Sequence, residues 1–387
     1  METNKRLYIR TLAVVVLLLC SVVPALAEEV RGEIVYIEGT VDIYRDGAKL
    51  DWRAVDIGTF LEPYDMVETG QDGFVEITLS QSGSGSTVTV EPDTSFYFDV
   101  DDVDGPRKTE FAVMAGSMAF RVQKLSGNEA FQVRTESVAM GVRGTEFRVA
   151  VAPEGSVLCT TKEGLVECKT DDRTQALSKP GQVVEKITEQ ELSTTQVAVE
   201  QLDQYQSSWI NDREEVFKRG AHTFIKGYGL QYVKVRPRFM QAYAELKRVE
   251  PQLRQVERSS GMGSTGQLFK MKGQVSPAVV KMRSILPMFE HVFFRLQRLS
   301  DYHAMGYGQG MMTGNTSTAE FFSDFNSMEM GMKRRLSETY YLLRLFQRLH
   351  ELTGGGPSLM DSPFGEEGGS GMPQGNVPEG FGESPFD

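Results

Sequence analysis

The chain has 387 residues, of which 40% are hydrophobic and 24% are charged, and its formal net charge is −12. Such an acidic surface repels the phosphates of nucleic acids and the headgroups of anionic lipids, which excludes binding to either as the main function. The length also exceeds what a single hydrophobic core usually organises, so two domains are expected.

The first 27 residues are predicted to be a secretory signal peptide. Cations precede an apolar run over residues 12–23, and Ala25-Leu26-Ala27 forms a small-residue cleavage site. This run is shorter than the roughly 20 residues that a membrane-spanning helix needs, and no later run reaches that length. The sequence therefore predicts an exported chain, in the periplasm or elsewhere in the cell envelope, without a transmembrane segment after cleavage. Lipid attachment at Cys20 is disfavoured, because a leucine precedes it where a small residue is preferred.

Residues 28–186 are predicted to form an all-β domain. Short runs in which apolar and polar residues alternate recur roughly every 8–12 residues, a spacing typical of a sandwich, barrel or roll. Turn sequences rich in glycine and aspartate separate the runs. Strands are expected over residues 33–37, 41–44, 74–79, 87–90, 95–98, 117–122, 131–134 and 147–151.

A glycine interrupts what otherwise looks like one strand between Val138 and Val151. The apolar residues occupy even positions up to Val142 and odd positions from Phe147 onward. A β-bulge at Gly144, which can adopt a positive φ, would absorb the extra residue and keep both halves facing the core. The neighbouring Arg143 and Thr145 are expected to brace the bulge, with Glu146 and Phe147 completing the motif. Binding of an anionic partner group by Arg143 and Thr145 is the alternative.

Two cysteines flank a predicted hairpin turn at Glu163-Gly164. A two-residue turn there would place Cys159 directly opposite Cys168, in a non-hydrogen-bonded pair whose short Cα separation suits a cross-strand disulfide. An oxidising envelope favours the bond. Two free core thiols, or a turn shifted by one residue, are the alternatives.

Residues 187–353 are predicted to form an α-helical domain, because the chain becomes poor in glycine and its apolar residues take helical spacing. Helices are expected over about 187–219, 226–259, 276–305 and 317–352. In the last of them an apolar stripe is formed by Leu336, Tyr340, Leu343, Phe346 and Leu349. These helices are expected to pack together as an antiparallel hairpin or bundle.

Residues 354–387 are predicted to be a disordered tail. They include ten glycines, five prolines and six acidic residues, but no lysine or arginine. Such a composition cannot bury a core. The sequence Ser-Pro-Phe occurs at 362–364 and again at 384–386. Its phenylalanines are either docking anchors for a partner or incidental to a biased sequence.

The sequence has no recognised catalytic or metal-binding motif, so no enzyme, no cofactor and no metal site are predicted. All four histidines lie in the helical half without zinc-motif spacing, and no nucleophile or phosphate-loop motif is present. The acidic run over residues 99–105 lacks the spacing of a calcium loop. Ten of the 18 methionines lie between Met262 and Met332. Copper binding there is the alternative to adaptable core filling.

Several segments of the β half, taken in order, resemble one known family. They are Gly39-Thr40-Val41, Asp65-Met66-Val67-Glu68-Thr69-Gly70, Val90-Glu91-Pro92-Asp93-Thr94-Ser95, Ala115-Gly116-Ser117, Phe131-Gln132-Val133-Arg134-Thr135, Val142-Arg143-Gly144-Thr145-Glu146-Phe147-Arg148-Val149 and Lys179-Pro180-Gly181-Gln182. Over about residues 33–185 the chain resembles the FecR-like periplasmic domain, named for bacterial iron-dicitrate signalling regulators. The Arg-Gly-Thr-x-Phe sequence is the most specific part.

The resemblance implies a sandwich-like or short solenoid-like envelope domain that binds other proteins and is not an enzyme. Regulators of this family also carry a cytoplasmic sigma-factor-binding segment and a membrane helix. Here the predicted signal peptide leads almost directly into the β domain, so direct control of a sigma factor is not expected. The predicted function is a non-catalytic protein-binding or signalling scaffold of the bacterial envelope. Binding of cell-wall glycan, and a periplasmic role in transport-linked signalling, are the alternatives.

Overall fold

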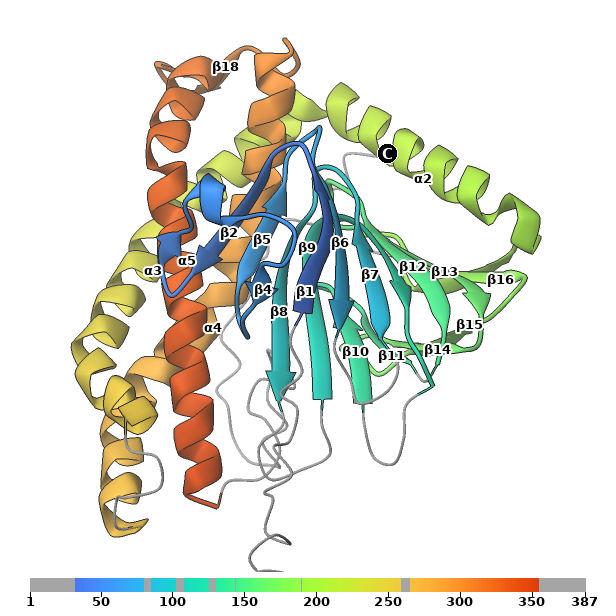
Figure 1. Ribbon diagram of the computed structural model, residues 1–387. Helices are drawn as coiled ribbons and strands as arrows, with labels where there is room; N and C mark the ends of the chain where they lie inside the picture. The colour runs from blue at the N-terminus through green and yellow to red at the C-terminus, as the bar shows by residue number, and fades with distance from the viewer. Residues whose placement is uncertain are drawn as a thin grey trace, which may run out of the picture.

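The computed structural model describes residues 32–79, 85–101, 108–124, 130–142, 144–188, 190–258 and 265–354 (Figure 1). The predicted signal peptide and Arg143 lie outside these residues. So do all but the first residue of the predicted tail and most of the acidic run at 99–105.

The β domain consists of two facing layers, which we call the outer sheet and the inner sheet. Hydrogen bonds connect all seventeen strands into one continuous system. The outer sheet contains, in spatial order, β4 (Phe60–Leu61), β1 (Gly32–Glu38), β6 (Phe74–Leu79), β7 (Ser86–Val90), β9 (Lys108–Arg121), β12 (Glu146–Val151), β13 (Val157–Glu163), β16 (Gln182–Lys186) and β17 (Leu192–Gln196). The inner sheet contains β3 (Ala48–Lys49), β2 (Val41–Arg45), β5 (Met66–Thr69), β8 (Ser95–Asp101), β9 again, β10 (Ala130–Arg134), β11 (Ala139–Val142), β14 (Val166–Lys169) and β15 (Gln175–Ser178).

Strand β9 belongs to both sheets and joins them. Its first half pairs with β8 and, in parallel, with β10, whereas its second half pairs with β7 and β12. The strand changes sheet near Gly116, whose φ is +87°. A Cβ atom at this position would lie 2.3 Å from the Thr94 hydroxyl oxygen, so only glycine fits.

Alternate side chains of the inner sheet enter two different cores. On β8, Phe96 and Phe98 point between the two sheets, while Tyr97 points into the core that the sheet shares with the helices. The inner sheet is therefore buried on both faces. This arrangement explains why all four residues of β5 are buried, although its sequence Met-Val-Glu-Thr includes a glutamate.

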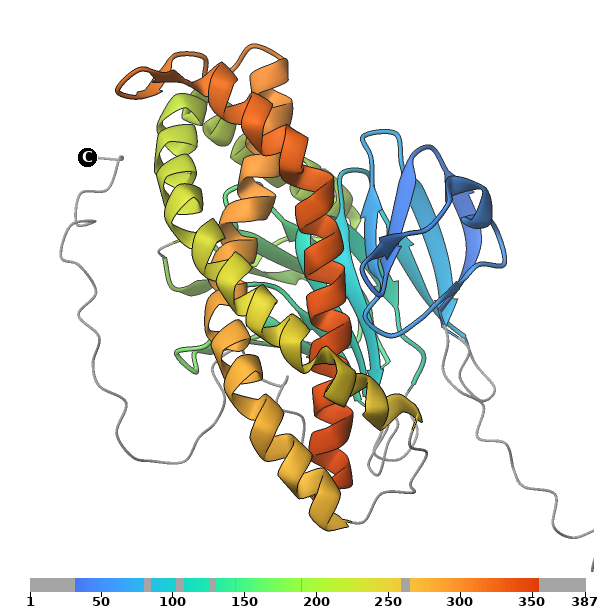
Figure 2. The same ribbon diagram turned by 90° about the vertical axis from the view of Figure 1, so that its left-hand side faces the viewer.

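In the described part of the chain, four α-helices follow the β domain: α2 (Leu202–Arg219), α3 (Ala221–Arg258), α4 (Thr265–Ala304) and α5 (Thr318–Leu352). A short hairpin of β18 (Met311–Thr313) and β19 (Thr316–Ser317) connects α4 to α5. Helices α3, α4 and α5 pack together and cover the inner sheet (Figure 2). Helix α2 instead lies over the outer sheet, where Trp209 packs with Leu158 and Val183 (Figure 1). The predicted fold class, an all-β domain followed by a helical region, is confirmed.

Helix α5 follows its sequence pattern closely. All five residues of the predicted stripe from Leu336 to Leu349 are buried. The helix begins after Ser317, whose hydroxyl accepts a hydrogen bond from the Glu320 amide while the Glu320 carboxylate accepts one from Ser317.

The first predicted helix was placed too early in the chain. Residues 192–196 form strand β17, which pairs with β16, and the helix begins only at Leu202. Ser193, Thr194 and Thr195 are half-buried or exposed, so this edge strand has no clear apolar alternation. Its pairing with the preceding strand β16, and not an apolar pattern of its own, makes it a strand.

Candidate functional site

The segment around Gly144 crosses from one sheet to the other. Strand β11 ends at Val142 in the inner sheet, and β12 begins at Glu146 in the outer sheet. The predicted single bulged strand is therefore wrong, although Gly144 has the expected positive φ of +67°. When the chain crosses to the facing sheet, the core-facing residues change from even-numbered to odd-numbered positions. Val142 and Phe147 therefore face the same core. A register shift does occur, but between Glu146 and Phe147.

The described residues beside Gly144 make contacts within the β domain. Thr145 is buried and its hydroxyl has no hydrogen-bond partner among the described residues, so it does not brace the turn; its carbonyl accepts from Val122 at 2.8 Å. Glu146 pairs with Arg121 at 3.2 Å on the surface, and the Phe147 ring stacks on Phe120 at 4.9 Å. Arg143 is outside the described residues, and its role in binding stays a prediction.

Cys159 and Cys168 lie in different sheets. Cys159 on β13 pairs with Val149 and Val184, whereas Cys168 on β14 pairs with Met140 and Ala176. The predicted cross-strand register is therefore wrong. Both thiols are buried and free, and they meet across the sandwich core; the hydrogen bond to Cys159, together with burial, raises the pKa of the Cys168 thiol. A disulfide between them would join the two sheets, and we retain it as a proposal.

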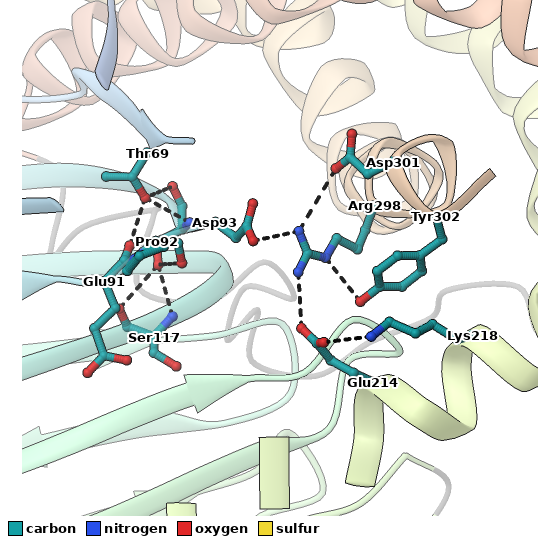
Figure 3. A network of polar contacts seen from close by, with 11 residues as sticks. Thr69, Glu91, Pro92, Asp93, Ser117, Glu214, Lys218, Arg298, Asp301 and Tyr302 are labelled. Atoms are coloured by element: carbon teal, nitrogen blue, oxygen red, sulfur yellow. Dashed lines mark hydrogen bonds and ion pairs between the residues drawn. The ribbon is translucent and has the colours of Figure 1, made fainter. Parts of the chain in front are cut away.

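A network of polar contacts attaches the β7–β8 turn to the helices (Figure 3). The turn is fixed from inside: the Thr69 hydroxyl donates to the Glu91 carbonyl at 2.7 Å and accepts from the Thr94 amide at 2.9 Å. The Thr94 hydroxyl in turn accepts from the Ser117 amide at 3.0 Å. These bonds hold Asp93, whose φ is +56°, with its carboxylate toward helix α4.

Arg298 of α4 is the centre of this network. Its guanidinium contacts Asp93 at 2.8 Å, Glu214 of α2 at 3.0 Å and the Tyr302 hydroxyl at 3.2 Å. The Arg298 guanidinium thus connects the β7–β8 turn with helices α2 and α4. Burial raises the pKa of the nearby Asp301 to about 6, with Arg298 opposing the rise.

A second charged pair at this junction is almost completely buried. The Lys333 ammonium of α5 lies 2.7 Å from the Glu68 carboxylate of β5, and their side chains are only 10% and 8% exposed. Glu329 approaches Lys333 at 2.9 Å. Burial opposes the charge on Lys333, but the two carboxylates outweigh it and raise its pKa.

Glu290 of α4 is a buried carboxyl at the same junction. The Tyr340 hydroxyl of α5 donates to it at 3.1 Å, and Tyr97 of β8 lies nearby. Burial raises the pKa of Glu290 to about 8, while the two tyrosines oppose the rise. The carboxyl is therefore mostly neutral at pH 7.

A further contact joins Glu136, in the turn after β10, to α4. Glu136 accepts from His291 and lies 2.9 Å from Arg295, which also donates to the Glu154 carbonyl at 3.3 Å. Burial opposes ionisation of Glu136, but the hydrogen bond from His291 and the charge of Arg295 prevail and lower its pKa to about 2.

These clusters hold the sheet to the helices and do not form a catalytic constellation. Each carboxylate is matched by a cation or a hydroxyl, and no nucleophile lies beside a base in them. Within the described ranges, no group of three or more histidine, cysteine or acidic side chains is arranged to hold a metal ion. Among the same residues, no helix has both the length and the apolar character to cross a membrane.

The sequence pattern did not predict this junction, although one signal was present. Lys333 precedes Leu336 by three residues and Tyr340 by seven, so it lies on the buried stripe of α5. Glu290 likewise lies within the apolar sequence Phe289 to Phe294. An ionisable residue on a buried face requires a partner. The partners are far away in sequence, which is why the pairs themselves could not be found.

An edge of the β domain carries an exposed apolar patch, the 51–62 loop. It contains the short helix η1 (Trp52–Ala54), which projects away from α3, α4 and α5 (Figure 2). Its exposed fractions are 73% for Trp52, 63% for Ile57 and 44% for Phe60. Arg53 stacks over Trp52 at 5.3 Å.

Comparison with known proteins gives one family match, inside the β domain. Residues 65–167 match the family model described as FecR protein. Curated proteins give no match. Two crystal structures of a candidate anti-sigma factor from Parabacteroides distasonis, at 2.50 and 1.65 Å resolution, are each 16% identical to the chain with a TM-score of 0.31. The similar region covers 36% of this chain and 62% and 63% of theirs, so the chain spans less than two thirds of those proteins. The resemblance to a FecR domain is confirmed for the matched residues.

Proposed function

We propose that this chain, which carries a FecR domain over residues 65–167, is an exported bacterial envelope protein that acts as a non-catalytic, protein-binding scaffold. The expected domain boundary at residue 186 moves, in this proposal, to residues 197–201, between β17 and α2. The observation that supports protein binding best is the exposed apolar patch of the 51–62 loop. Exposed apolar groups gathered on one rigid segment are typical of an interface.

The 51–62 loop is held in place before any partner arrives. Arg45 donates to the Asp65 carboxylate at 2.6 Å, to Glu62 at 2.7 Å and to the Phe60 carbonyl at 2.8 Å. The Thr59 hydroxyl donates to the Ala54 carbonyl at 3.1 Å. A preorganised loop loses little entropy when it binds, so its apolar area contributes efficiently to affinity.

The strand beside the loop leaves part of its edge open. On the side away from β6, strand β1 pairs with β4 only at Gly32 and Glu33. Next to these pairs, the Ile34 amide donates to the Thr59 carbonyl at 2.9 Å and the Ile34 carbonyl accepts from the Gly58 amide at 2.8 Å. Beyond Ile34, no described strand pairs with β1 on that side. An extended segment of a partner protein could add to this edge and cover the patch at the same time.

A photo-crosslinking amino acid at Trp52 in intact cells tests the proposal. Mass spectrometry should identify one main envelope protein crosslinked at this position. The same amino acid at Lys226, an exposed position on helix α3, serves as the control and should not give that product. Equal products from both positions, or attachment only to cell-wall glycan at Trp52, would contradict protein binding through the loop.

A further inference from the structure

An open groove of about 550 Å³ lies between helices α3 and α5 on the helical side of the molecule. Its floor and walls include Met240 of α3 with Met328 and Met332 of α5. Gly331 contributes no side chain, which leaves the space open between them. Methionine side chains adapt their shape and make favourable contacts with aromatic rings, so such a groove suits a phenylalanine.

Two arginines line the groove, and neither has close carboxylate partners as Arg298 does. The closest acceptor of Arg236 is the Met328 sulfur at 2.9 Å, a weak acceptor, and Asp324 lies 3.8 Å away on a side chain that is 71% exposed. Arg335 donates to the Gly331 carbonyl at 2.8 Å and forms no ion pair with a carboxylate among the described residues. Both guanidinium groups therefore retain donors for an incoming carboxylate.

The chain's own C-terminal segment has the complementary chemistry. Residues 355–387 carry six acidic residues and no cation, and Phe364 stands between Asp361 and the pair Glu366-Glu367. From Met332 to Leu352, helix α5 runs about 30 Å. The ten residues from Gly354 to Phe364 reach up to about 34 Å when fully extended, so Phe364 can return to the Met332 end of the groove when this segment runs nearly straight.

We propose that the groove between α3 and α5 binds the acidic, phenylalanine-containing tail of the same chain. The Phe364 ring enters between Met240, Met328 and Met332, and the flanking carboxylates pair with Arg236 and Arg335. Attachment to α5 keeps the tail at a high effective concentration, so a weak intrinsic contact suffices. The tail would exclude any acidic peptide of similar chemistry until that peptide displaces it.

A benzophenone amino acid at Phe364 of the full chain tests this proposal, since benzophenone inserts readily beside methionine sulfur. The expected product is an intramolecular crosslink to Met240, Met328 or Met332. Arg236→Glu should reduce its yield at least about fivefold through loss of the ion pair. Arg238→Glu changes the same charge on the same helix outside the groove and should leave the yield unchanged.

A second variant separates docking from folding. Gly331→Leu places a side chain in the groove at a helical position where only the flexible Arg335 end lies near the new Cβ, at 3.0 Å. Helix propensity should keep or raise the melting temperature while the crosslink is lost. Crosslinks scattered over the surface, crosslinks only between two copies, or a yield unchanged by Arg236→Glu and Gly331→Leu would each overturn the proposal.

Discussion

The two sides of the β domain differ in what they bury. Beside the inner sheet, buried ionisable groups such as Glu68 of β5 and Glu290 of α4 have partners on α5, so this side needs its helices permanently. On the other side, the 51–62 loop exposes Trp52 and Ile57 and has its polar contacts at the surface. A permanent contact can include desolvated charges, because it never has to open. A surface kept free for a partner carries apolar groups that tolerate water.

The largest expected effect is on the buried pair of the permanent junction. Lys333→Ala should lower the free energy of unfolding by about 3–5 kcal/mol, because Glu68 would remain buried without its cation. Lys49→Ala is the control, since Lys49 pairs with Asp42 at 2.6 Å near the surface. That change should cost at most about 1 kcal/mol. Equal effects in urea unfolding would show that the junction is not specially dependent on its charges.

The crossover between the sheets should be nearly as sensitive. Gly144→Val forces a branched residue to a φ of +67° and brings its Cβ to 3.0 Å from the Lys124 Cα. We expect a loss of about 3 kcal/mol in unfolding free energy. Gly141→Ala is the matched control, because nothing lies within 4 Å of a Cβ there. A tolerated Gly144→Val would contradict the positive-φ crossover.

The junction should also respond to pH through Glu290. Its pKa in the folded protein, about 8, is higher than in the unfolded chain. The stability it contributes is therefore present at low pH and is lost as the pH rises through 8. Between pH 6 and 8.5 this loss should be about 2–3 kcal/mol. Glu290→Gln should flatten that part of the stability curve, and an unchanged slope would argue against a neutral Glu290.

A somewhat smaller effect on stability is expected from the two core cysteines. If Cys159 and Cys168 are bonded in exported protein, Cys159→Ser should lower the melting temperature of the β domain by the equivalent of about 2 kcal/mol. Mass spectrometry of unreduced peptides reports the bond directly. Two free thiols in freshly isolated envelope material would rule out the disulfide and leave them as core side chains.

The sequence predicted the positions of strands and helices better than it predicted which strands and side chains contact one another. The stripe of α5 and most strands follow from local periodicity, because each residue's burial depends on its own position in the element. The predicted pairing across Glu163-Gly164 was wrong. Apolar and polar residues alternate around Cys159 and Cys168 in the same way whether the two strands pair with each other or belong to facing sheets. The buried pair of Lys333 and Glu68 joins residues distant in the chain. No local pattern specifies such a contact.

The most direct test of the two-sided account is the affinity of the crosslinked partner for two variants. Replacing Trp52, Ile57 and Phe60 by serine should change the free energy of unfolding by no more than about 0.5 kcal/mol, as expected for exposed sites. The same variant should weaken partner binding at least about tenfold, because these residues supply the apolar contact area. Lys333→Ala, measured where it remains folded, should bind normally. Normal binding by the triple variant, or loss of binding in folded Lys333→Ala, would contradict the account.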